Sequence, residues 1–422
     1  MKEDFRIRIA VWVLFIYCLI PLYTNAQSGV NSPYSRYGVG VLSEQSSGIA
    51  KAMGGIGAGF RQDNTINLKN PASYSTVDTL TFIADLGLAL QNGNFSEYDV
   101  KVNARNAYFT HIAVQYRILP KVGMTLGVMP FSNVGYNFSS TELVRRDKDG
   151  DGDITSTNTY SGTGGLRQFM GGFGWRPTDW LSAGVNVSYL TGDINYYVYN
   201  RYSSSDVQSR TLLYSADMAG LKLDFGLQGT IRLGENTLVL GATFAPAQKL
   251  ESSETYKADI HSLGDTLDID DAFSLPELLS AGFTYKWKNR MVGADVSYQT
   301  WSKASFFGKK NGLDRLSASV GFMIRPDESS KNLFKRSSYQ VGLNYSQPYF
   351  KVGDNKGPMQ LGVSAGISFP INTAYNSMSY LHISGEYVRV EPMAKGMITE
   401  NYLRINIGVT FMERWFMKLM VD

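Results

Sequence analysis

The chain has 422 residues, a formal net charge of +3 and only 18% charged residues, together with 42 Gly, 26 Tyr and 22 Phe. A net charge this small argues against a nucleic-acid-binding surface. The single cysteine, Cys18, lies in the apolar N-terminal run, so the mature chain is expected to have no disulfide, thiol nucleophile or cysteine metal site.

The first 26 residues are predicted to be an export signal. A positively charged start precedes an apolar run at 9–23, and Ala26 offers a small residue for cleavage. A membrane anchor is the alternative, but the run is shorter than the roughly 20 residues of a spanning helix and contains Pro21. We therefore expect an exported chain that begins after residue 26.

Alternation of apolar and polar residues predicts β-strands through the rest of the chain. In LSAGVNVSY (181–189) and LRINIGVTF (403–411), every second residue is apolar or aromatic, and most of the residues between are small or polar. Lipid outside and a polar lumen inside produce this pattern in outer-membrane barrels, whereas a soluble sandwich or propeller is the alternative. We expect about 14 strands, at approximately 79–91, 105–118, 122–139, 161–176, 180–199, 217–232, 236–251, 276–288, 290–303, 313–326, 338–350, 358–370, 378–391 and 400–415.

The connections between these strands fall into two classes. Tight turns follow the even-numbered strands, at 119–123, 176–180, 232–237 and 286–291. Longer connections follow odd-numbered strands, at 140–160, 200–216 and 252–275. Outer-membrane barrels have short periplasmic turns and long extracellular loops, so both termini are predicted to be periplasmic.

An irregular segment precedes the first strand. It begins with NSPYSRYGVGVL (31–42), in which Pro33 and two glycines disfavour regular structure while Tyr34, Arg36 and Tyr37 call for partners. A glycine-rich run, GGIGAG (54–59), follows. It lacks the flanking strand and helix of a nucleotide-binding loop.

This segment resembles a known family in AKAMGGIGAG (50–59), in Asp63, and in Asn70, Pro71 and Ala72 before the first strand. These residues are similar to the N-terminal hatch of the FadL/TodX outer-membrane transport family. The resemblance implies a fourteen-stranded barrel, a hatch inside it, and passage of hydrophobic molecules through a lateral opening at a kinked strand. The shuttle barrels of type IX secretion also look similar and do a different job.

The resulting domain prediction is a signal peptide at 1–26, a lumen plug at 27–78 and an all-β transmembrane antiparallel barrel at 79–422. Irregular backbone is tolerated at membrane depth only inside protein or water. A disordered periplasmic leader is the alternative for the plug. The residues expected to form it are Tyr34, Arg36, Tyr37, Gly54, Gly55, Gly57, Asn70 and Pro71.

Several charged residues lie on the polar faces of the predicted strands. They are expected either to form cross-strand ladders that hold the plug or simply to be solvated in a wet lumen. Arg36 is expected to pair with a carboxylate among them. This set is Lys222, Asp224, Lys286, Asp295, Glu386 and Arg404.

Two further features concern the wall. Pro246 and Pro348 are the candidates for a kinked strand, because proline removes a ladder donor. Interfacial aromatic girdles are expected to contain Tyr189, Tyr285, Trp287, Tyr298, Trp301 and Trp415.

One acidic stretch, DKDGDGD (147–153), resembles the start of a calcium loop. Asp147, Asp149, Asp151 and Asp153 offer carboxylate oxygens, but the twelfth position holds Asn158 in place of a bidentate Glu. The alternative is a solvated acidic loop tip. Either way, the stretch is predicted to be extracellular.

Catalytic patterns are weak. GVSAG (362–366) matches a nucleophile elbow around Ser364, but it lies in an unbroken strand pattern rather than a strand-to-helix turn. The histidines His111, His261 and His382 lack metal-ligand spacing. We predict that the chain is not an enzyme and needs no cofactor, apart from Ca²⁺ in the acidic loop.

The predicted function is a passive, FadL-like channel for small hydrophobic molecules in the outer membrane of a Gram-negative cell. Membrane lipid and a small hydrophobic ligand would be its partners. The alternative is an accessory barrel that binds other outer-membrane proteins in secretion or assembly and transports nothing.

Overall fold

The structure is a computed structural model, and it describes residues 29–63, 65–145, 153–204, 207–258, 273–306, 308–325, 330–372 and 378–414. The predicted signal peptide lies outside these ranges. So do Asp147, Asp149 and Asp151 of the predicted calcium loop, His261, and Trp415.

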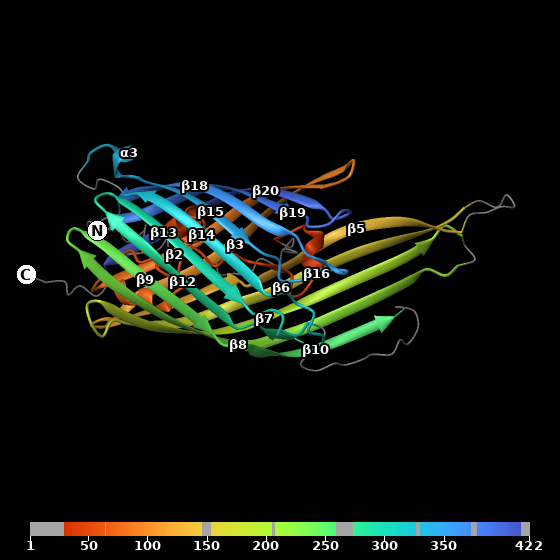
Figure 1. Cartoon of the computed structure of the whole chain (residues 1–422), viewed down its shortest axis with the longest axis horizontal. Helices are drawn as coiled ribbons and strands as arrows, with labels where there is room; N and C mark the ends of the chain where they lie inside the picture. Colours follow the sequence, from red (N-terminus) through yellow and green to blue (C-terminus); the bar gives the residue numbers. More distant parts are fainter. Residues whose placement is uncertain are drawn as a thin grey trace, which may run out of the picture.

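Fourteen antiparallel strands form a closed barrel, as predicted (Figure 1). β2 (Thr81–Glu97) pairs with β20 (Thr399–Arg414) and closes the sheet on itself. Two wall positions consist of two pieces each, β4 (Val122–Pro130) with β5 (Ser132–Arg145), and β9 (Asn236–Ala245) with β10 (Gln248–Ala258). The other wall strands are β3 (Val100–Leu119), β6 (Ile154–Trp175), β7 (Leu181–Tyr202), β8 (Arg210–Leu233), β12 (Leu278–Trp287), β13 (Arg290–Gln299), β14 (Arg315–Ile324), β15 (Ser338–Ser346), β18 (Met359–Asn372) and β19 (Met378–Glu391).

The remaining elements are short. Among the described residues no helix is long and apolar enough to span a membrane. The short elements are η1 (Pro33–Arg36), β1 (Val41–Leu42), α2 (Gly48–Ala52), η2 (Pro71–Thr76), β11 (Phe273–Leu275), α3 (Leu333–Arg336), β16 (Lys351–Val352) and β17 (Asn355–Lys356).

The wall alternates between an apolar outer face and a polar inner face. In β7, Val187 and Tyr189 are each 47% exposed, whereas the intervening Asn186 and Ser188 are buried toward the lumen. β20 repeats the pattern with exposed Leu403. Successive side chains of a strand point to opposite faces, so a lipid-facing belt and a polar lumen follow directly from the sequence alternation.

Several strands run much further than the sequence alternation indicated. β6 and β7 have 22 residues each and β8 has 24, so they continue into the predicted loops at 140–160 and 200–216. β10 likewise enters the predicted loop at 252–275. We call this part the extension; it consists of residues 134–145, 154–165, 190–202, 210–219 and 251–258, and it projects beyond the other strands (Figure 1).

The prediction of long loops was wrong because the extension lacks an apolar outer face. Its outer surface has residues such as Asp193 in place of the leucines and valines of the belt. Without lipid on one side, the sequence alternation fades although the backbone ladder continues.

An apolar cluster fills the lumen where the extension begins. Trp301 is fully buried in it, with its ring centroid 4.6 Å from that of Tyr349. The expectation that Trp301 belongs to an interfacial girdle was therefore wrong. β13 ends at Gln299, and the turn that follows places the indole inside rather than on the lipid face.

Candidate functional site: the occupied lumen and the gap in the wall

The N-terminal segment, residues 29–77, lies inside the barrel and bonds to its inner wall. Its part nearest the first wall strand is η2, which begins at the buried Asn70. Asn70 Oδ1 accepts a hydrogen bond from the Ala72 N–H (3.0 Å), and Asn70 Nδ2 donates to the Ala58 carbonyl (2.7 Å) and the Leu227 carbonyl (3.2 Å). Pro71 occupies the first turn, where no N–H is needed. One side chain thus connects the helix cap, the glycine-rich run and β8.

The glycine-rich run is bound by Asp295 of β13. The carboxylate oxygen Oδ2 accepts hydrogen bonds from the backbone N–H groups of Gly57 and Ala58, the latter at 2.8 Å. Asp295 is only 8% exposed. Two amide donors to one carboxylate satisfy much of the hydrogen-bonding capacity of a charge that would be costly to bury alone.

The same run is held from the opposite wall by Ser364. Ser364 Oγ donates to the Ala52 carbonyl (2.9 Å) and accepts from the Gly54 N–H (3.2 Å). Gly54 has φ = +70°, and a Cβ on the facing wall residue Gly342 would lie 2.0 Å from the Gly54 nitrogen. Glycine is required on both sides of this contact. Ser364 therefore anchors the segment rather than serving as a nucleophile.

Arg61 is a buried cation that the sequence patterns did not indicate. Its guanidinium donates to Ser182 Oγ (2.8 Å), Gln228 Oε1 (3.3 Å) and Ser75 Oγ (3.4 Å), and Lys286 donates to its carbonyl. Burial, with a smaller contribution from a neighbouring arginine, lowers the pKa of Arg61 to about 10. No spacing or repeat marks such a residue, because the segment is irregular.

The predicted lumen charges lie on the inner wall. Asp295 and Lys286 bind backbone groups of the N-terminal segment. The others pair with each other: Lys222 bonds to Asp224 on the same strand, and Arg404 lies 3.5 Å from Glu386 on the adjacent strand. Two of these charges thus contact the segment directly, and one pair, Arg404 with Glu386, crosses between strands.

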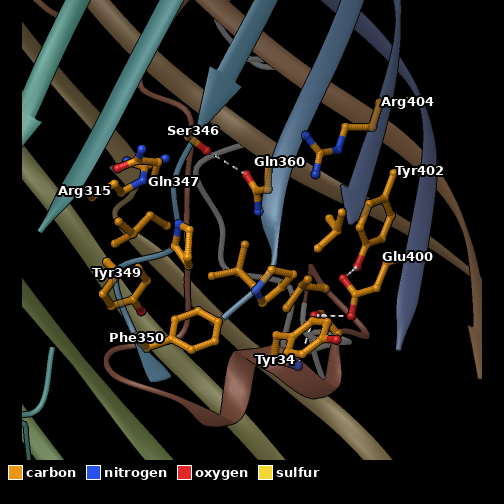
Figure 2. A pocket seen from close by; sticks show the side chains of 17 residues that line it. Tyr34, Arg315, Ser346, Gln347, Tyr349, Phe350, Gln360, Glu400, Tyr402 and Arg404 are labelled. Carbon is orange, nitrogen blue, oxygen red and sulfur yellow. Dashed lines mark hydrogen bonds between the residues drawn. The ribbon is translucent and has the colours of Figure 1, made fainter. Parts of the chain in front are cut away.

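The opening stretch, residues 31–42, forms η1 and β1 and packs against the wall (Figure 2). Ser32 Oγ donates to Glu400 Oε1 (2.6 Å), and the Tyr34 hydroxyl donates to the Ile398 carbonyl (2.6 Å). The Tyr37 ring stacks on Phe350 with centroids 5.2 Å apart. The stretch is therefore ordered by contacts distant in sequence.

The expected ion pair of Arg36 with Asp224, Asp295 or Glu386 is absent. The guanidinium instead lies over the Tyr160 ring, 4.6 Å from its centroid. η1 packs on β5 near the extension, so Arg36 meets the aromatic inner face of that sheet. The aromatic ring attracts the cation in place of a carboxylate.

The wall has a gap in its hydrogen-bonded ladder between β3 and β5. β3 pairs with β2 along most of its length, from Val100 to Tyr116, but with β4 only from Ile112 to Leu119. β5 pairs with β6 and, through Ser132 and Asn133, with β1. Within the part of the chain that the structure describes, no ladder joins residues 100–111 of β3 to β5.

The N-terminal segment bridges this gap. On the β3 side, Asn31 Nδ2 donates to Asn106 Oδ1 (3.1 Å). On the β5 side, Val41 and Leu42 pair with the start of β5. Gly40, with φ = +94°, comes so close to β5 that a Cβ would lie 2.5 Å from a backbone oxygen.

The interruption in the wall lies at Pro130, where β4 ends, rather than at either predicted proline. Pro246 does separate β9 from β10, but β8 pairs with both pieces on one side, and on the other side β12 pairs with β9 and β11 with the start of β10. The wall therefore stays continuous there. Pro348 follows the end of β15 and interrupts no ladder. At Pro130, β6 also pairs with both pieces, and the wall opens because β3 pairs with β4 and not with β5.

Two small cavities remain in the lumen near η1 and the gap. One cavity of about 50 Å³ lies beside η1 and is lined by residues that include Tyr34, Arg315 and Glu400 (Figure 2). A second, of about 60 Å³, lies at the gap between Tyr108 and Asn133. Its lining contains charges of both signs, contributed by Glu44, Lys51, Glu386 and Arg404.

A larger cavity of about 560 Å³ lies among residues at the ends of the short-turn strands. Lys286, Arg325, Asp63 and Asp78 contribute to its lining. His382 reaches it and bonds to Thr410 Oγ1 (2.8 Å). His382 and His111 both lie near one buried carboxylate, Asp85. The sequence did not indicate this, because the histidines have no metal-ligand spacing.

The structure describes only one of the four carboxylates of the predicted calcium loop. Asp153 is exposed, and the other three carboxylates lie outside the described residues. Among the residues that are described, no group of three or more His, Cys, Asp or Glu side chains could hold a metal ion.

Comparison with known proteins gives a family and a fold. A family model described as BamG matches residues 7–422. No curated protein sequence matches the chain.

Among solved structures, the toluene transporter TodX of Pseudomonas putida is 15% identical, with a TM-score of 0.57 over 89% of this chain and 100% of that chain. The toluene transporter TbuX of Ralstonia pickettii is 14% identical (TM-score 0.57; 88% and 99% covered). A FadL homologue of Pseudomonas aeruginosa is 9% identical (TM-score 0.58; 88% and 99% covered).

These likenesses confirm the predicted resemblance at the level of the fold. The two toluene proteins are described as transporters.

Proposed function

The chain belongs to the BamG family, and from this premise and its FadL-like fold we propose that it is an outer-membrane barrel of the channel type, closed here, that passes small hydrophobic molecules passively. The observation that carries the proposal is the gap between β3 and β5, which the chain's own N-terminal segment covers.

A gate requires that the segment covering the gap can detach from the wall. At the gap itself, the segment meets the wall through the hydrogen bond between Asn31 and Asn106, through Ser35 Oγ with the backbone of Gly135, and through one two-residue strand pairing at β1. Short pairings with few backbone hydrogen bonds have low free energies of local opening. Displacement of residues 31–42 would open the lumen through this gap, at the boundary between the lipid-facing belt and the extension. Toluene and other monoaromatic hydrocarbons, named for similar barrels, indicate the class of cargo to test.

A disulfide tests the gate directly. Leu42 and Ser132 lie opposite each other on β1 and β5, and Cys18 is the only native cysteine. In Leu42→Cys/Ser132→Cys, oxidation should hold the gate closed and reduce uptake of radiolabelled toluene by intact cells, and reduction should restore it. The single variant Leu42→Cys should not respond to oxidant. Equal uptake in the oxidised and reduced states would overturn the channel proposal.

A second candidate function is an accessory barrel that binds protein partners. The observation in its favour is how little space remains in the lumen near η1 and the gap. The two cavities there have volumes of about 50 and 60 Å³, and the lining of the second includes Glu44, Lys51, Glu386 and Arg404. Pockets for small apolar ligands usually measure roughly 300–1,000 Å³ and are mostly apolar. A filled, charged lumen suits a structural barrel better than a hydrocarbon route.

The two candidates differ in what purification should yield. An accessory barrel extracted from native membranes in mild detergent should remain in a stoichiometric complex with other outer-membrane proteins, and the reduced double variant should show no toluene uptake above cells lacking the protein. A barrel that purifies alone and supports uptake would contradict the accessory function.

A further inference from the structure

β5 presents an open strand edge to the gap. On one side it pairs with β6 along almost its whole length. On the other side, the described residues supply a strand partner only to Ser132 and Asn133. Beyond them, Ser35 Oγ accepts from the Gly135 N–H (3.0 Å) and donates to the Gly135 carbonyl (3.2 Å).

The contact at Gly135 fixes which backbone groups face the gap. In an antiparallel ladder, the N–H and C=O of one residue point to the same side, and the side alternates along the strand. The groups of Gly135 point away from β6, so those of Asn137, Ser139 and Thr141 do as well. Within the described part of the chain these outward groups have no hydrogen-bond partner.

This edge lacks the features that usually prevent strand addition. Protected edges carry charges, prolines or bulges. From Tyr136 to Thr141 the sequence is YNFSST, with neither charge nor proline, and the bulge comes only between Leu143 and Arg145. The other open edge of the extension, on β10, is different, because Glu251, Glu254 and Lys257 interrupt it.

The face beside the edge offers a recognition surface. Phe138 and Tyr160 stack with centroids 5.2 Å apart on the inner side, and Arg36 lies over Tyr160. On the outer side, hydroxyl pairs link Ser139 to Thr159 (2.9 Å) and Thr141 to Thr157 (3.0 Å). A strand laid along the edge would therefore have an aromatic face on one side and a hydroxyl face on the other.

We propose that the β5 edge, residues 137–141, binds an extended segment of a partner protein by strand addition. Backbone hydrogen bonds to the outward groups give the affinity, and apolar residues at alternate positions of the partner pack on Phe138. β1 already uses the beginning of the same edge in this way, so the partner strand would continue an existing pairing. This inference rests on the accessory function and names the surface through which the barrel would bind its partner.

Photocrosslinking can read the pairing register in living cells. A photoreactive residue is placed in the full chain at Asn137, Ser139 or Thr141, with Tyr197 on the outer face of β7 as the control position. Crosslinked residues of the partner should fall in one segment and shift by two positions for each step along β5. The control position should not yield this series.

Two substitutions at Ser139 separate backbone from side chain. Ser139→Pro removes an outward N–H and leaves the pairing with β6 intact, whereas Ser139→Ala loses only the hydroxyl. The proline variant should lose the crosslinks at 137 and 141, and the alanine variant should keep them. Thr141→Pro, read from position 137, repeats the test should the first proline variant assemble poorly.

The outcomes distinguish the two hypotheses. Crosslinks to this chain itself, crosslinks without a two-residue shift, or equal yields from the proline and alanine variants would overturn strand addition. If a stoichiometric complex still purifies in that case, the accessory function survives. Absence of any complex would overturn both.

Discussion

At the scale of single residues, the barrel holds its N-terminal segment through side chains that accept or donate to backbone groups. Asp295, Ser364 and Asn70 each bind two or more groups of the segment or its surroundings. Buried backbone groups away from regular structure need such partners. The irregular segment is thus specified by polar contacts as much as by apolar packing.

Removal of the Asp295 carboxylate should loosen the glycine-rich run. Asp295→Ala leaves the N–H groups of Gly57 and Ala58 without their acceptor, at a cost of about 1.5–3 kcal/mol in unfolding free energy. Denaturant titration in detergent, with hydrogen exchange at these two amides, measures the effect.

The matched control is Asp193→Ala, which removes an exposed carboxylate of β7 that has no contact with the segment. Equal losses of stability in the two variants, or unchanged exchange at Gly57 and Ala58, would show that Asp295 does not hold the run.

Residue-level prediction from sequence succeeded where the strand pattern applied. Alternation alone placed Asp295 and Glu386 in the lumen, because each lies between apolar neighbours on a predicted strand. The partner of Asp295 could not be predicted, since the glycine-rich run has no period. Arg36 was assigned a carboxylate partner because sequence spacing cannot show that η1 lies beside Tyr160.

At the scale of elements, a strand can be predicted from the sequence where one of its faces contacts lipid, because that contact produces the alternation of apolar and polar residues. All fourteen wall positions were predicted, because each has a stretch with one apolar face. The outer parts of the extension, in the predicted loops at 140–160, 200–216 and 252–275, were mistaken for loops, because both of their faces lie outside the belt and carry polar or aromatic residues. The split at Pro130 was missed for a different reason. Pro246 gives the same local signal, and the two sites differ only in the strands on one side: β3 pairs with β4 alone, whereas β12 and β11 pair with β9 and β10.

The boundary between belt and extension can be tested within one strand. Val187 and Tyr199 of β7 point to the same outer face and are 47% and 43% exposed. Val187→Arg should cost about 2–4 kcal/mol in a lipid-refolding assay, because the charge enters hydrocarbon. Tyr199→Arg should cost much less, because that part of the strand meets water. Similar costs at both positions would place the extension inside the membrane.

The bridge over the gap can be tested by accessibility. Asn106 is only 9% exposed and bonds to Asn31. In Asn106→Cys, deletion of residues 31–42 should increase the rate of labelling by a membrane-impermeant maleimide. Asp193→Cys, on the outer face, should label at the same rate with or without the deletion. An unchanged rate at position 106 would mean that the opening stretch does not cover β3.

At the scale of the whole molecule, a wide barrel is closed by its own chain. A fourteen-stranded sheet encloses more space than its inward side chains fill, and the N-terminal segment occupies the remainder. Composition, alternation and the short hatch motif were enough to predict this architecture. They could not decide between transport and partner binding, because similar barrels support different functions and the deciding features are the gap and the β5 edge.

The conductance of single molecules in planar lipid bilayers tests the central claim, that residues 29–77 close the barrel. The full chain and a chain lacking these residues are compared after heat-modifiable migration shows that both have folded. We expect the full chain to stay near the baseline and the shortened chain to form a steady pore for small ions. A folded shortened chain that conducts no more than the full chain would contradict the account.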